Sequence, residues 1–541
     1  MTNKKHIINK VLFEVNTTDT KTAYYLKDNL DVFFKQSLLP TIQTYFDSIT
    51  SINNTIIRLD KLELNINSND VKDELQLQMA IIKELQKKLI HKKDSEFSKE
   101  KGAEFLTIDK GKSNTETFLH FLKTGQTPWW DLEIDIKQDA FLSHIIYSKD
   151  FRVKLCEILL NNQVRKRLIY QFSNEELLKI LGKDNPQVEF PKKLKKRVIR
   201  ERYWETIMKY LTDKNLKSLQ EDLISVFIKL NKKKINKTLT NEIEDVFELK
   251  TILNKISSDK TKQEQWLKLK ISLIDSLKKM VFKDSLVTLE DGLYNGIRND
   301  TRSNIDTGIL QEIIEESVKR THQTLKELFH TFKEEIVPFT STVISNKLKE
   351  LKFNPVKNSK GIINQAFPKE FLEQDSSIYV HNAGLVLLHP YLERLFMELN
   401  LLNEERKVKP EKADLAIHLL HFIATKREKQ LENNLVFEKF LCGYPMDKPI
   451  RKNIRLPQKY KVEAERMLQA VLNNWQALKN TSVDGIRENF IKRSGKLMLD
   501  DQSKYRMIVE RKTQDILLEK LPWNLNLIKI PWIDKLLFVE W

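Results

Sequence analysis

The sequence predicts a mainly α-helical protein that carries a small N-terminal α/β unit and a mixed C-terminal module. Glycine is scarce, with 12 in 541 residues, and leucine, lysine, glutamate and isoleucine are abundant, a composition that favours helices. The start of the chain alternates hydrophobic and polar residues, as strands do. The last third, residues 378–541, holds four of the eight tryptophans and seven of the fourteen prolines, which is typical of a compact module with a packed core.

The N-terminal unit, residues 1–93, is predicted to begin with a strand. Residues 6–16 place Val11, Phe13 and Val15 on one face. Alternation of this kind indicates a strand with one buried side.

A helix and a second strand are expected to complete this unit. Asp19 is expected to cap the helix, in which Pro40 either introduces a kink or begins a second helix. The second strand spans residues 56–66, and its hydrophobic phase changes near residues 60–61, which suggests a bulge. Residues 70–93 are expected to form a surface helix.

Residues 94–117 are polar and contain two glycines, which makes them the first predicted linker. They include Gly111-Lys112-Ser113, the end of a phosphate-binding loop motif. Leu106 occupies the position of the earlier glycine, which such a loop needs to wrap its amides around a phosphate. We therefore favour a loop without a nucleotide.

A short hydrophobic helix from Phe118 is expected to end at Gly125 as its C′ residue. Pro128 then precedes two tryptophans. In one interpretation Trp129 and Trp130 pack the end of the helix against the core, and this is the favoured one. In the other they form an exposed docking site for a partner.

Residues 118–337 are predicted to form a helical middle region without a sequence repeat. Residues 290–308 are a second linker candidate, and an amphipathic helix at 309–336 ends before Pro338. An irregular connector, residues 338–377, leads to the C-terminal module.

Two basic clusters lie within the middle region. Neither contains the interleaved aromatic residues of a platform that stacks single-stranded nucleic acid. A solvated helix face is favoured over a surface for an anionic partner. The clusters are Lys192, Lys193, Lys195, Lys196, Arg197, Arg200 and Arg202, and then Lys232, Lys233, Lys234 and Lys237.

The end of the chain, residues 521–541, has the pattern of a strand, a turn and a strand. Trp523 and Trp532 lie in this stretch. They are either core residues or contacts to a partner, and the core is favoured.

The net charge is +17, from 92 basic and 75 acidic residues. A surplus of this size attracts polyanions, which include nucleic acid, acidic membranes and acidic protein surfaces. No window is long and apolar enough to predict a membrane span, and the first residues lack the hydrophobic core of a signal peptide. Cys156 and Cys442 are far apart in sequence, which favours two inert thiols in a reducing cytoplasm.

The sequence contains no recognisable catalytic, cofactor or metal motif, so we predict no enzyme, no cofactor and no small-molecule substrate. It has no HExxH, GxSxG, GxGxxG, paired CxxC or EF-hand pattern. His418 and His421 can share one face of a helix, but no carboxylate or cysteine at a recognisable spacing completes a metal site. Packed, hydrogen-bonded histidines are the favoured interpretation.

A series of short blocks runs in order along both ends of the chain and reaches its last residue. The blocks are residues 6–15, Leu38-Leu39-Pro40, residues 57–64, 118–130, 382–388 and 418–420, Leu441-Cys442-Gly443, residues 475–482, 485–490 and 509–512, Leu521-Pro522-Trp523, Ile530-Pro531-Trp532 and Val539-Glu540-Trp541. In this order they resemble the tape-measure proteins of contractile injection systems of the antifeeding-prophage and Photorhabdus-virulence-cassette type. The middle of the chain is similar to the family only in being helical.

The resemblance implies a structural role and no active site. A tape-measure protein sits in the growing inner tube, attached near the baseplate hub, and sets how many rings stack before a terminator caps the tube. The implied partners are therefore the inner tube and the baseplate hub and spike proteins, with the tube terminator as a further one. The implied location is the bacterial cytoplasm during assembly and then the lumen of the tube.

A helical middle region suits such a ruler. A helix advances about 1.5 Å per residue, so about 230 residues reach roughly 350 Å at most. The helices also carry enough apolar residues to pack on one another, and we expect a compact free form that opens on assembly. Two alternatives stay open: an assembly chaperone or hub adaptor of the same particle, and a basic helical scaffold that binds nucleic acid.

Overall fold

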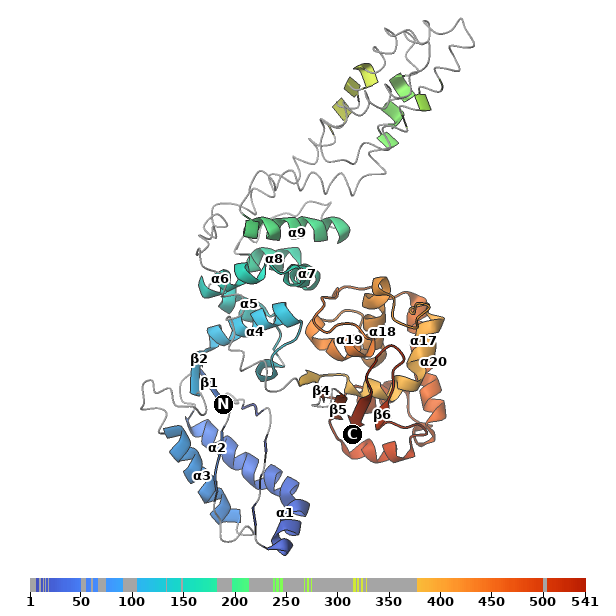
Figure 1. The fold of residues 1–541 in the computed structure, drawn as a ribbon. Coiled ribbons are helices and arrows are strands. Elements are labelled where there is room, and N and C mark those ends of the chain that lie inside the picture. The colour runs from blue at the N-terminus through green and yellow to red at the C-terminus, as the bar shows by residue number, and fades with distance from the viewer. Residues whose placement is uncertain are drawn as a thin grey trace, which may run out of the picture. The chain divides into compact units, whose positions relative to one another are not determined.

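The chain is mainly α-helical, as the sequence predicts, with small sheets near its two ends (Figure 1). The structure is a computed structural model. It describes residues 6–8, 11–12, 14, 16–17, 19–49, 55–59, 62–66, 74–90, 105–132, 134–146, 149–181 and 197–213, scattered positions between 237 and 327, and residues 377–499 and 504–541.

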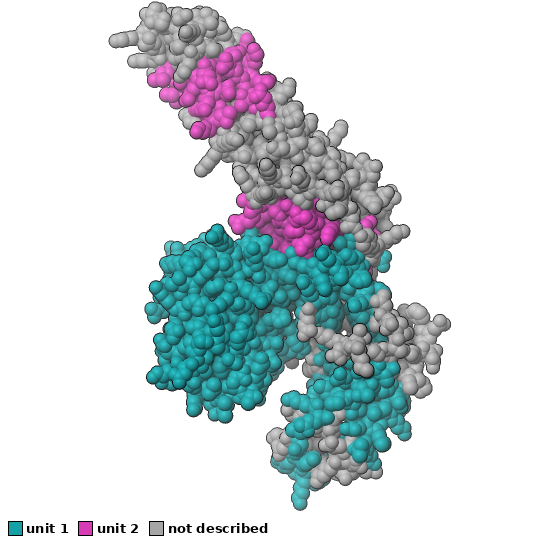
Figure 2. All heavy atoms as spheres, turned by 180° about the vertical axis from the view of Figure 1, so that it is seen from behind, with its two compact units in different colours: residues 1–151, 356–541 teal, residues 152–355 magenta. Residues whose placement is uncertain are grey.

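The chain divides into two compact units (Figure 2). One comprises Met1–Phe151 and Val356–Trp541, and the other comprises Arg152–Pro355. The domain boundaries that we derived from sequence remain predictions.

The first helices are continuous through a wide turn. Helix α1 (Thr20–Phe33) leads into a π-helical turn, Phe34–Leu38, and then into α2 (Leu39–Ile49). Asp19 caps α1, because its carboxylate accepts a hydrogen bond from the Lys21 amide at 3.2 Å. Pro40 lies at the second residue of α2. It lacks an N–H and its ring crowds the carbonyl four residues earlier, and the wider π-turn at that position relieves the clash.

The N-terminal sheet differs from the one expected. Strand β1 (Thr55–Leu59) pairs antiparallel with β2 (Phe105–Asp109), and Ile57 lies opposite Thr107. The described residues of the expected strand at 6–16 have no regular structure, so that prediction is wrong for them. The true partner of β1 is only five residues long and lies among polar residues, which hid it in the sequence.

The second predicted strand is shorter than expected. It ends at Leu59, and the described residues 62–66 form no strand. The apolar side chains after it, Leu62, Leu64 and Ile66, pack instead on a small cluster that contains Leu85. The expected bulge at residues 60–61 lies outside the described residues.

Helix α3 (Glu74–Ile90) confirms the predicted helix and supplies half of that cluster. Ile81 and Leu85 on α3 are buried against Leu38 and Tyr45 from the first helices. With so few buried residues, this core is small. Several large apolar residues of the region stay exposed, among them Leu75 and Met79.

Helix α4 (Lys110–Thr124) begins inside the expected linker. Residues 105–117 form β2 and the first half of α4, so the linker prediction is wrong for them, and residues 94–104 lie outside the described ones. The Gly111-Lys112-Ser113 segment forms the first turn of α4 and is not a loop. The Asp109 carboxylate caps it by accepting from the Gly111 amide at 2.7 Å, which places a negative charge where a phosphate would bind.

Helix α4 ends as the sequence predicts. Gly125 has a φ of 82°, and its amide donates to the Phe121 carbonyl at 2.7 Å. Only glycine adopts this left-handed geometry without strain. A short 3₁₀ turn, Trp129–Asp131, follows Pro128.

His120 in α4 makes stability depend on pH. Burial, together with the charge of Lys123, lowers its pKa from 6.5 to about 4. The native ring therefore stays neutral over this interval, whereas the ring of the unfolded chain takes up a proton below 6.5. Its contribution to stability is complete above pH 6.5 and is lost as the pH falls towards 4. We expect the urea concentration at the unfolding midpoint to fall as the pH is lowered from 6.5 towards 4, and to fall less steeply in the variant His120→Gln. An equally steep fall in the variant would contradict the assignment to His120.

The middle of the chain is a succession of helices. Helix α5 (Asp139–Ile146) is followed by α6 (Lys149–Ile158), α7 (Asn162–Gln171), α8 (Asn174–Ile180) and α9 (Arg197–Asp213) (Figure 1). Helices α7 and α9 pack together. The described positions between 315 and 327 are helical, within the amphipathic helix predicted at 309–336.

One residue of the first basic cluster is structural. The Arg200 guanidinium donates to the Ile169 carbonyl at 2.7 Å, the Phe172 carbonyl at 2.5 Å and Asn174 Oδ1 at 2.8 Å. It thereby ties the end of α7 to α9, and its burial lowers its pKa. The solvated-face interpretation is wrong for Arg200, although Arg197 and Arg202 are exposed. Lys192 to Lys196 and Lys232 to Lys234 lie outside the described residues.

The C-terminal module, residues 378–541, contains a five-stranded mixed sheet. The strands are β3 (Ile378–Val380), β4 (Gly495–Leu499), β5 (Tyr505–Val509), β6 (Leu527–Ile528) and β7 (Leu537–Glu540). Their order is β3-β4-β5-β7-β6, with β5 and β7 parallel and the other pairs antiparallel. The antiparallel pair β6 and β7 confirms the predicted strand, turn and strand.

Helices complete this module. They are α17 (His389–Glu398), α18 (Ala413–Thr425), α19 (Val436–Leu441), α20 (Gln458–Asn474) and the short α21 (Val483–Ile486) (Figure 1). Helix α20 packs on α17, α18 and α21, and a single large hydrophobic core joins the helices to the sheet. In the part of the chain that the structure describes, no helix is long and apolar enough to cross a membrane.

Candidate functional site

A glycine holds two sequence blocks of the C-terminal module in direct backbone contact. Gly384 lies in the 3₁₀ segment Ala383–Leu388. A Cβ atom on it would lie 1.8 Å from the carbonyl oxygen of Phe490, in the π-helical turn Arg487–Ile491. Next to this contact, the amide that precedes Gly384 donates to the Arg493 carbonyl at 2.9 Å. Only glycine permits such an approach, so this position fixes how the two segments meet.

A second glycine accommodates Trp532. Gly443 has a φ of +63°, and a Cβ on it would lie 3.0 Å from the Trp532 ring. The indole is buried, stacks on Phe396 at 5.2 Å between ring centroids, and donates from Nε1 to the Leu441 carbonyl at 2.7 Å. The Leu441-Cys442-Gly443 and Ile530-Pro531-Trp532 blocks are therefore neighbours in the fold. Burial also raises the pKa of the Cys442 thiol well above its ordinary value, which keeps it unreactive.

Trp523 also packs against the core of this module but is partly exposed. Its Nε1 donates to the Leu387 carbonyl at 3.1 Å, and its ring meets Tyr391 edge to face. Both tryptophans near the end of the chain thus hold the module together. Their role in docking a partner stays a prediction.

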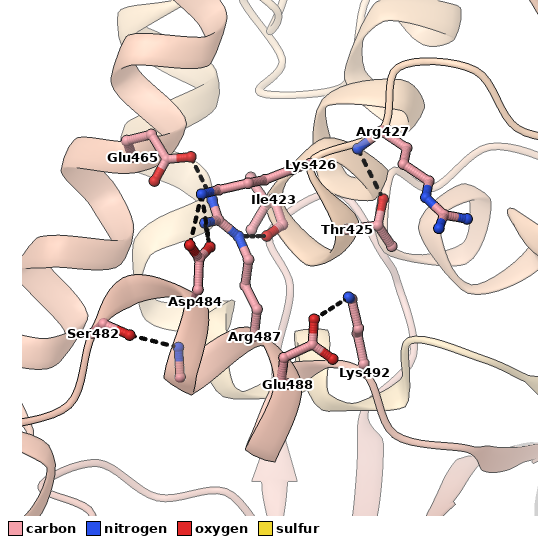
Figure 3. Close-up of polar contacts among 11 residues, drawn as sticks. Ile423, Thr425, Lys426, Arg427, Glu465, Ser482, Asp484, Arg487, Glu488 and Lys492 are labelled. Atoms are coloured by element: carbon pink, nitrogen blue, oxygen red, sulfur yellow. Dashed lines mark hydrogen bonds and ion pairs between the residues drawn. The ribbon is translucent and has the colours of Figure 1, made fainter.

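Arg487 is the centre of a charged cluster at the edge of the core (Figure 3). Its guanidinium is almost fully buried and donates to the Ile423 carbonyl at 2.8 Å, to Asp484 at 2.8 Å and to Glu465 at 2.6 Å. Lys426 reaches the same Asp484 at 2.7 Å. Lys426 and then Arg487 lower the pKa of this carboxylate. The cluster joins the end of α18 and the turn after α21 to the middle of α20.

Helix α21, which immediately precedes this arginine, begins with a side-chain cap. Ser482 Oγ accepts from the Gly485 amide at 3.0 Å. A Cβ on Gly485 would lie 2.6 Å from the methyl group of Thr481. The Thr481-Ser482 and Gly485-Ile486-Arg487 residues therefore make one compact turn.

A buried arginine fixes the last residue of the chain. Arg493 donates to the Asn489 carbonyl at 2.7 Å and to Asp515 at 2.8 Å, and its side chain is fully buried. Asp515 also accepts from Trp541 Nε1 at 3.0 Å. This network anchors the Val539-Glu540-Trp541 block.

A lysine and a glutamate form an ion pair inside the module. Lys439 Nζ lies 2.6 Å from Glu432 Oε1, and both side chains have no exposed area. The same ammonium donates to the carbonyls of Met446 at 2.9 Å and Lys448 at 2.8 Å. All three hydrogens of the ammonium are therefore used, which is the condition for a stable buried lysine.

The two histidines of α18 are packed, as the sequence predicts. His421 Nδ1 lies 3.3 Å from Glu438 Oε1, which also accepts from Asn382 at 2.7 Å. His418 lies between two backbone carbonyls, those of Glu428 at 2.9 Å and Arg451 at 2.6 Å. Burial lowers the pKa of His418, so the ring is neutral at pH 7 and donates to one carbonyl at a time.

Trp129 and Trp130 lie in a second cluster, in the N-terminal part of the chain. They are half-buried and meet edge to face, with ring centroids 5.7 Å apart. The Arg58 guanidinium lies 4.4 Å from the centre of the Trp130 ring and donates to Glu116 at 2.6 Å and Ser113 at 2.7 Å. Cation–π and ionic contacts therefore join β1, α4 and the tryptophan turn. A docking role of this pair stays a prediction.

Among the residues that the structure describes, no group of three or more His, Cys, Asp or Glu side chains could hold a metal ion. The buried polar groups connect secondary-structure elements. Their arrangement accounts for stability and for the joining of sequence blocks.

These packed blocks are the ones that carry the sequence resemblance. The family model of the contractile injection system tape measure protein matches residues 5–541. The chain belongs to this family. No curated protein and no solved structure matches the chain.

This tape measure protein therefore has a structural role in a contractile injection system. The family is structural, not enzymatic. Its members sit inside the tube of the particle, so the partners of this tape measure protein are components of that particle.

Sequence reasoning missed the buried ionic contacts of this tape measure protein. Lys439, Glu432, Arg493 and Asp515 are ordinary charged residues in sequence, and partners separated by 7 and 22 residues give no periodic signal. For Lys439 the sequence does indicate burial, because this lysine lies inside the hydrophobic run 435–442. A charged residue in such a run requires a buried partner.

Proposed function

We propose that this tape measure protein sets the length of the inner tube and sheath in an injection particle of the antifeeding-prophage or Photorhabdus-virulence-cassette type. In this proposal it is made in the bacterial cytoplasm and lies in the lumen of the tube. The family match over residues 5–541 carries the proposal. The subtype rests on the ordered blocks at the two ends of the chain.

The two ends of the chain are suited to attachment. The C-terminal module has a large core in which Trp475, Phe490 and Leu385 have no exposed area or almost none. Such a core keeps its shape when the rest of the chain is rearranged. We assign this module to the baseplate hub and spike proteins, and the exposed apolar residues of the N-terminal part are available for tube proteins or the terminator.

The middle region is suited to measuring. Its described helices α6 to α9 bury Trp204, Ile207 and Met208 together with residues of α7 such as Leu168. Extension along a tube breaks these contacts, and contacts with the tube wall must replace them. We therefore expect these helices to be packed together in the free protein and to separate on assembly.

Protease protection in purified particles tests the location. A resident tape measure co-purifies with intact particles and resists added protease until the tube is opened. A protein needed for assembly but absent from finished particles would instead be a chaperone. A particle-bound protein that is cleaved at once would lie outside the lumen.

The absorbance ratio of the purified free protein tests the nucleic-acid alternative. We expect the ratio of absorbance at the nucleic-acid maximum to absorbance at the protein maximum to be that of a protein free of nucleic acid. The reason is that neither basic cluster is accompanied by aromatic residues for stacking. A raised ratio that nuclease treatment lowers would favour a nucleic-acid scaffold.

A further inference from the structure

Two loops of the C-terminal module are fixed side by side. The first, residues 426–431, follows α18, and the second, residues 448–457, precedes α20. An antiparallel bridge joins Lys429 to Asn453. The ring of His418, from within the core, lies against a backbone carbonyl of each loop, at 2.9 and 2.6 Å.

A carboxylate between the loops strengthens this attachment. Glu428 of the first loop accepts from the Leu456 amide of the second at 2.9 Å. It also accepts from Lys461 on α20, and these contacts lower its pKa. Both oxygens of the Glu428 carboxylate are therefore used within the protein.

Three cations project from this loop pair, and one of them, Arg455, acts electrostatically on a neighbouring carboxylate, that of Glu428. Arg427, Lys429 and Arg455 are exposed, and in the described part of the chain none of them has an ion pair. Because the bridge is antiparallel, Arg427 and Arg455 each lie two residues from it on the same side. Figure 3 shows the Arg427 guanidinium directed away from the cluster around Asp484.

The neighbouring acids are bound by other groups, and this includes Glu428, which Lys461 and the Leu456 amide hold. Asp414 is occupied by Arg451 at 2.8 Å, and Asp484 is occupied by Lys426 and Arg487. The surface thus concentrates positive charge on a backbone that the core holds in place. A preorganised cluster of this kind loses little entropy when it binds a ligand with several negative charges.

We propose that the loop pair carrying Arg427, Lys429 and Arg455 binds an acidic segment of a protein partner. Two arginines with planar guanidinium groups suit paired carboxylates. The loops contain no aromatic side chain on which a base could stack, which favours a protein over single-stranded nucleic acid. That this partner is a component of the injection particle rests on the proposed function.

Binding of two model polyanions to the full-length protein tests this proposal. The probes are a dye-labelled decaglutamate peptide and a dye-labelled decathymidylate, followed by fluorescence anisotropy at about 100 mM salt. The variant Arg427→Glu/Lys429→Glu/Arg455→Glu should bind decaglutamate about tenfold more weakly, because each exposed ion pair contributes roughly twofold.

A matched control carries the same change in net charge. The variant Lys83→Glu/Lys110→Glu/Lys479→Glu alters three exposed lysines scattered over α3, α4 and the segment after α20. It should bind decaglutamate within about threefold of the unaltered protein.

Two outcomes would overturn the proposal. An equal loss in both variants would show that only overall charge matters. A loss of decathymidylate binding alone in the loop variant would assign the surface to nucleic acid. Neither result depends on particle assembly. The tape measure role is tested separately, by the protease protection of the protein in particles and by particle length.

Discussion

Replacing Gly384 with alanine is expected to destabilise the C-terminal module by at least about 3 kcal/mol, enough to leave most of the protein misfolded or insoluble. The added Cβ atom would lie 1.8 Å from the Phe490 carbonyl oxygen, and the obstacle is backbone, which cannot rotate away. The segment must therefore separate from the π-helical turn that it contacts. Chemical unfolding followed by tryptophan fluorescence, together with the soluble yield, measures the effect.

Gly111→Ala is the matched control. There the added Cβ would meet only Asp109 Oδ1, at 3.0 Å, which is the movable end of a side chain. Alanine also favours a helix over glycine. The unfolding midpoint should change little. A fully soluble Gly384→Ala protein of unaltered stability would contradict the packing described for this module.

Removing one partner of the buried ion pair is the second large effect that we expect. Lys439→Met leaves the Glu432 carboxylate charged, buried and without its ion-pair partner. Glu432→Met likewise leaves the Lys439 ammonium charged, buried and without this partner. Each single change should reduce the free energy of unfolding by about 3–5 kcal/mol. The double variant should lose no more than either single one, because it buries no unpaired charge.

Part of the loss should remain in the double variant. The carbonyls of Met446 and Lys448 lose their donor whenever Lys439 is replaced. The control is Lys407→Met, at an exposed pair with Glu405, which should cost less than about 1 kcal/mol. Losses that simply add in the double variant would show that the two buried groups act independently.

The sequence predicts those parts of the fold that depend on local chemistry. The cap at Asp19, the helix end at Gly125 and the final strand pair all follow from neighbouring residues, and the structure confirms them. The predicted mainly helical class is also confirmed, because scarce glycine and periodic apolar residues act over short distances.

Pairing over longer distances could not be predicted. Strand β1 pairs with β2, and the paired residues Ile57 and Thr107 are 50 positions apart in the sequence. Strand β2 also lies within a polar stretch that resembled a linker. Arg200 resembled a member of a solvated cluster, although it caps a helix that lies some 30 residues earlier. In both cases the deciding partner is distant in sequence, and composition carries no sign of it.

The contacts among blocks explain why the resemblance is concentrated at the ends of the chain. Gly384 meets Phe490, and Gly443 meets Trp532, so these positions tolerate few alternatives. No contact within the described part of the chain indicates whether a partner docks on the four tryptophans Trp129, Trp130, Trp523 and Trp532. Such docking depends on the surface of a partner, which the sequence of one chain does not contain.

Particle length is the most direct test of the central claim that this protein is the ruler. Deleting residues 247–286 shortens the middle region and leaves α6 to α9 unaltered, and doubling the same segment lengthens it. If the segment is helical in the tube, particles should be about 60 Å shorter or longer in electron micrographs. A scrambled segment of equal length should leave them unchanged. Tubes of full length after the deletion, whether fewer or equally many, would contradict a ruler.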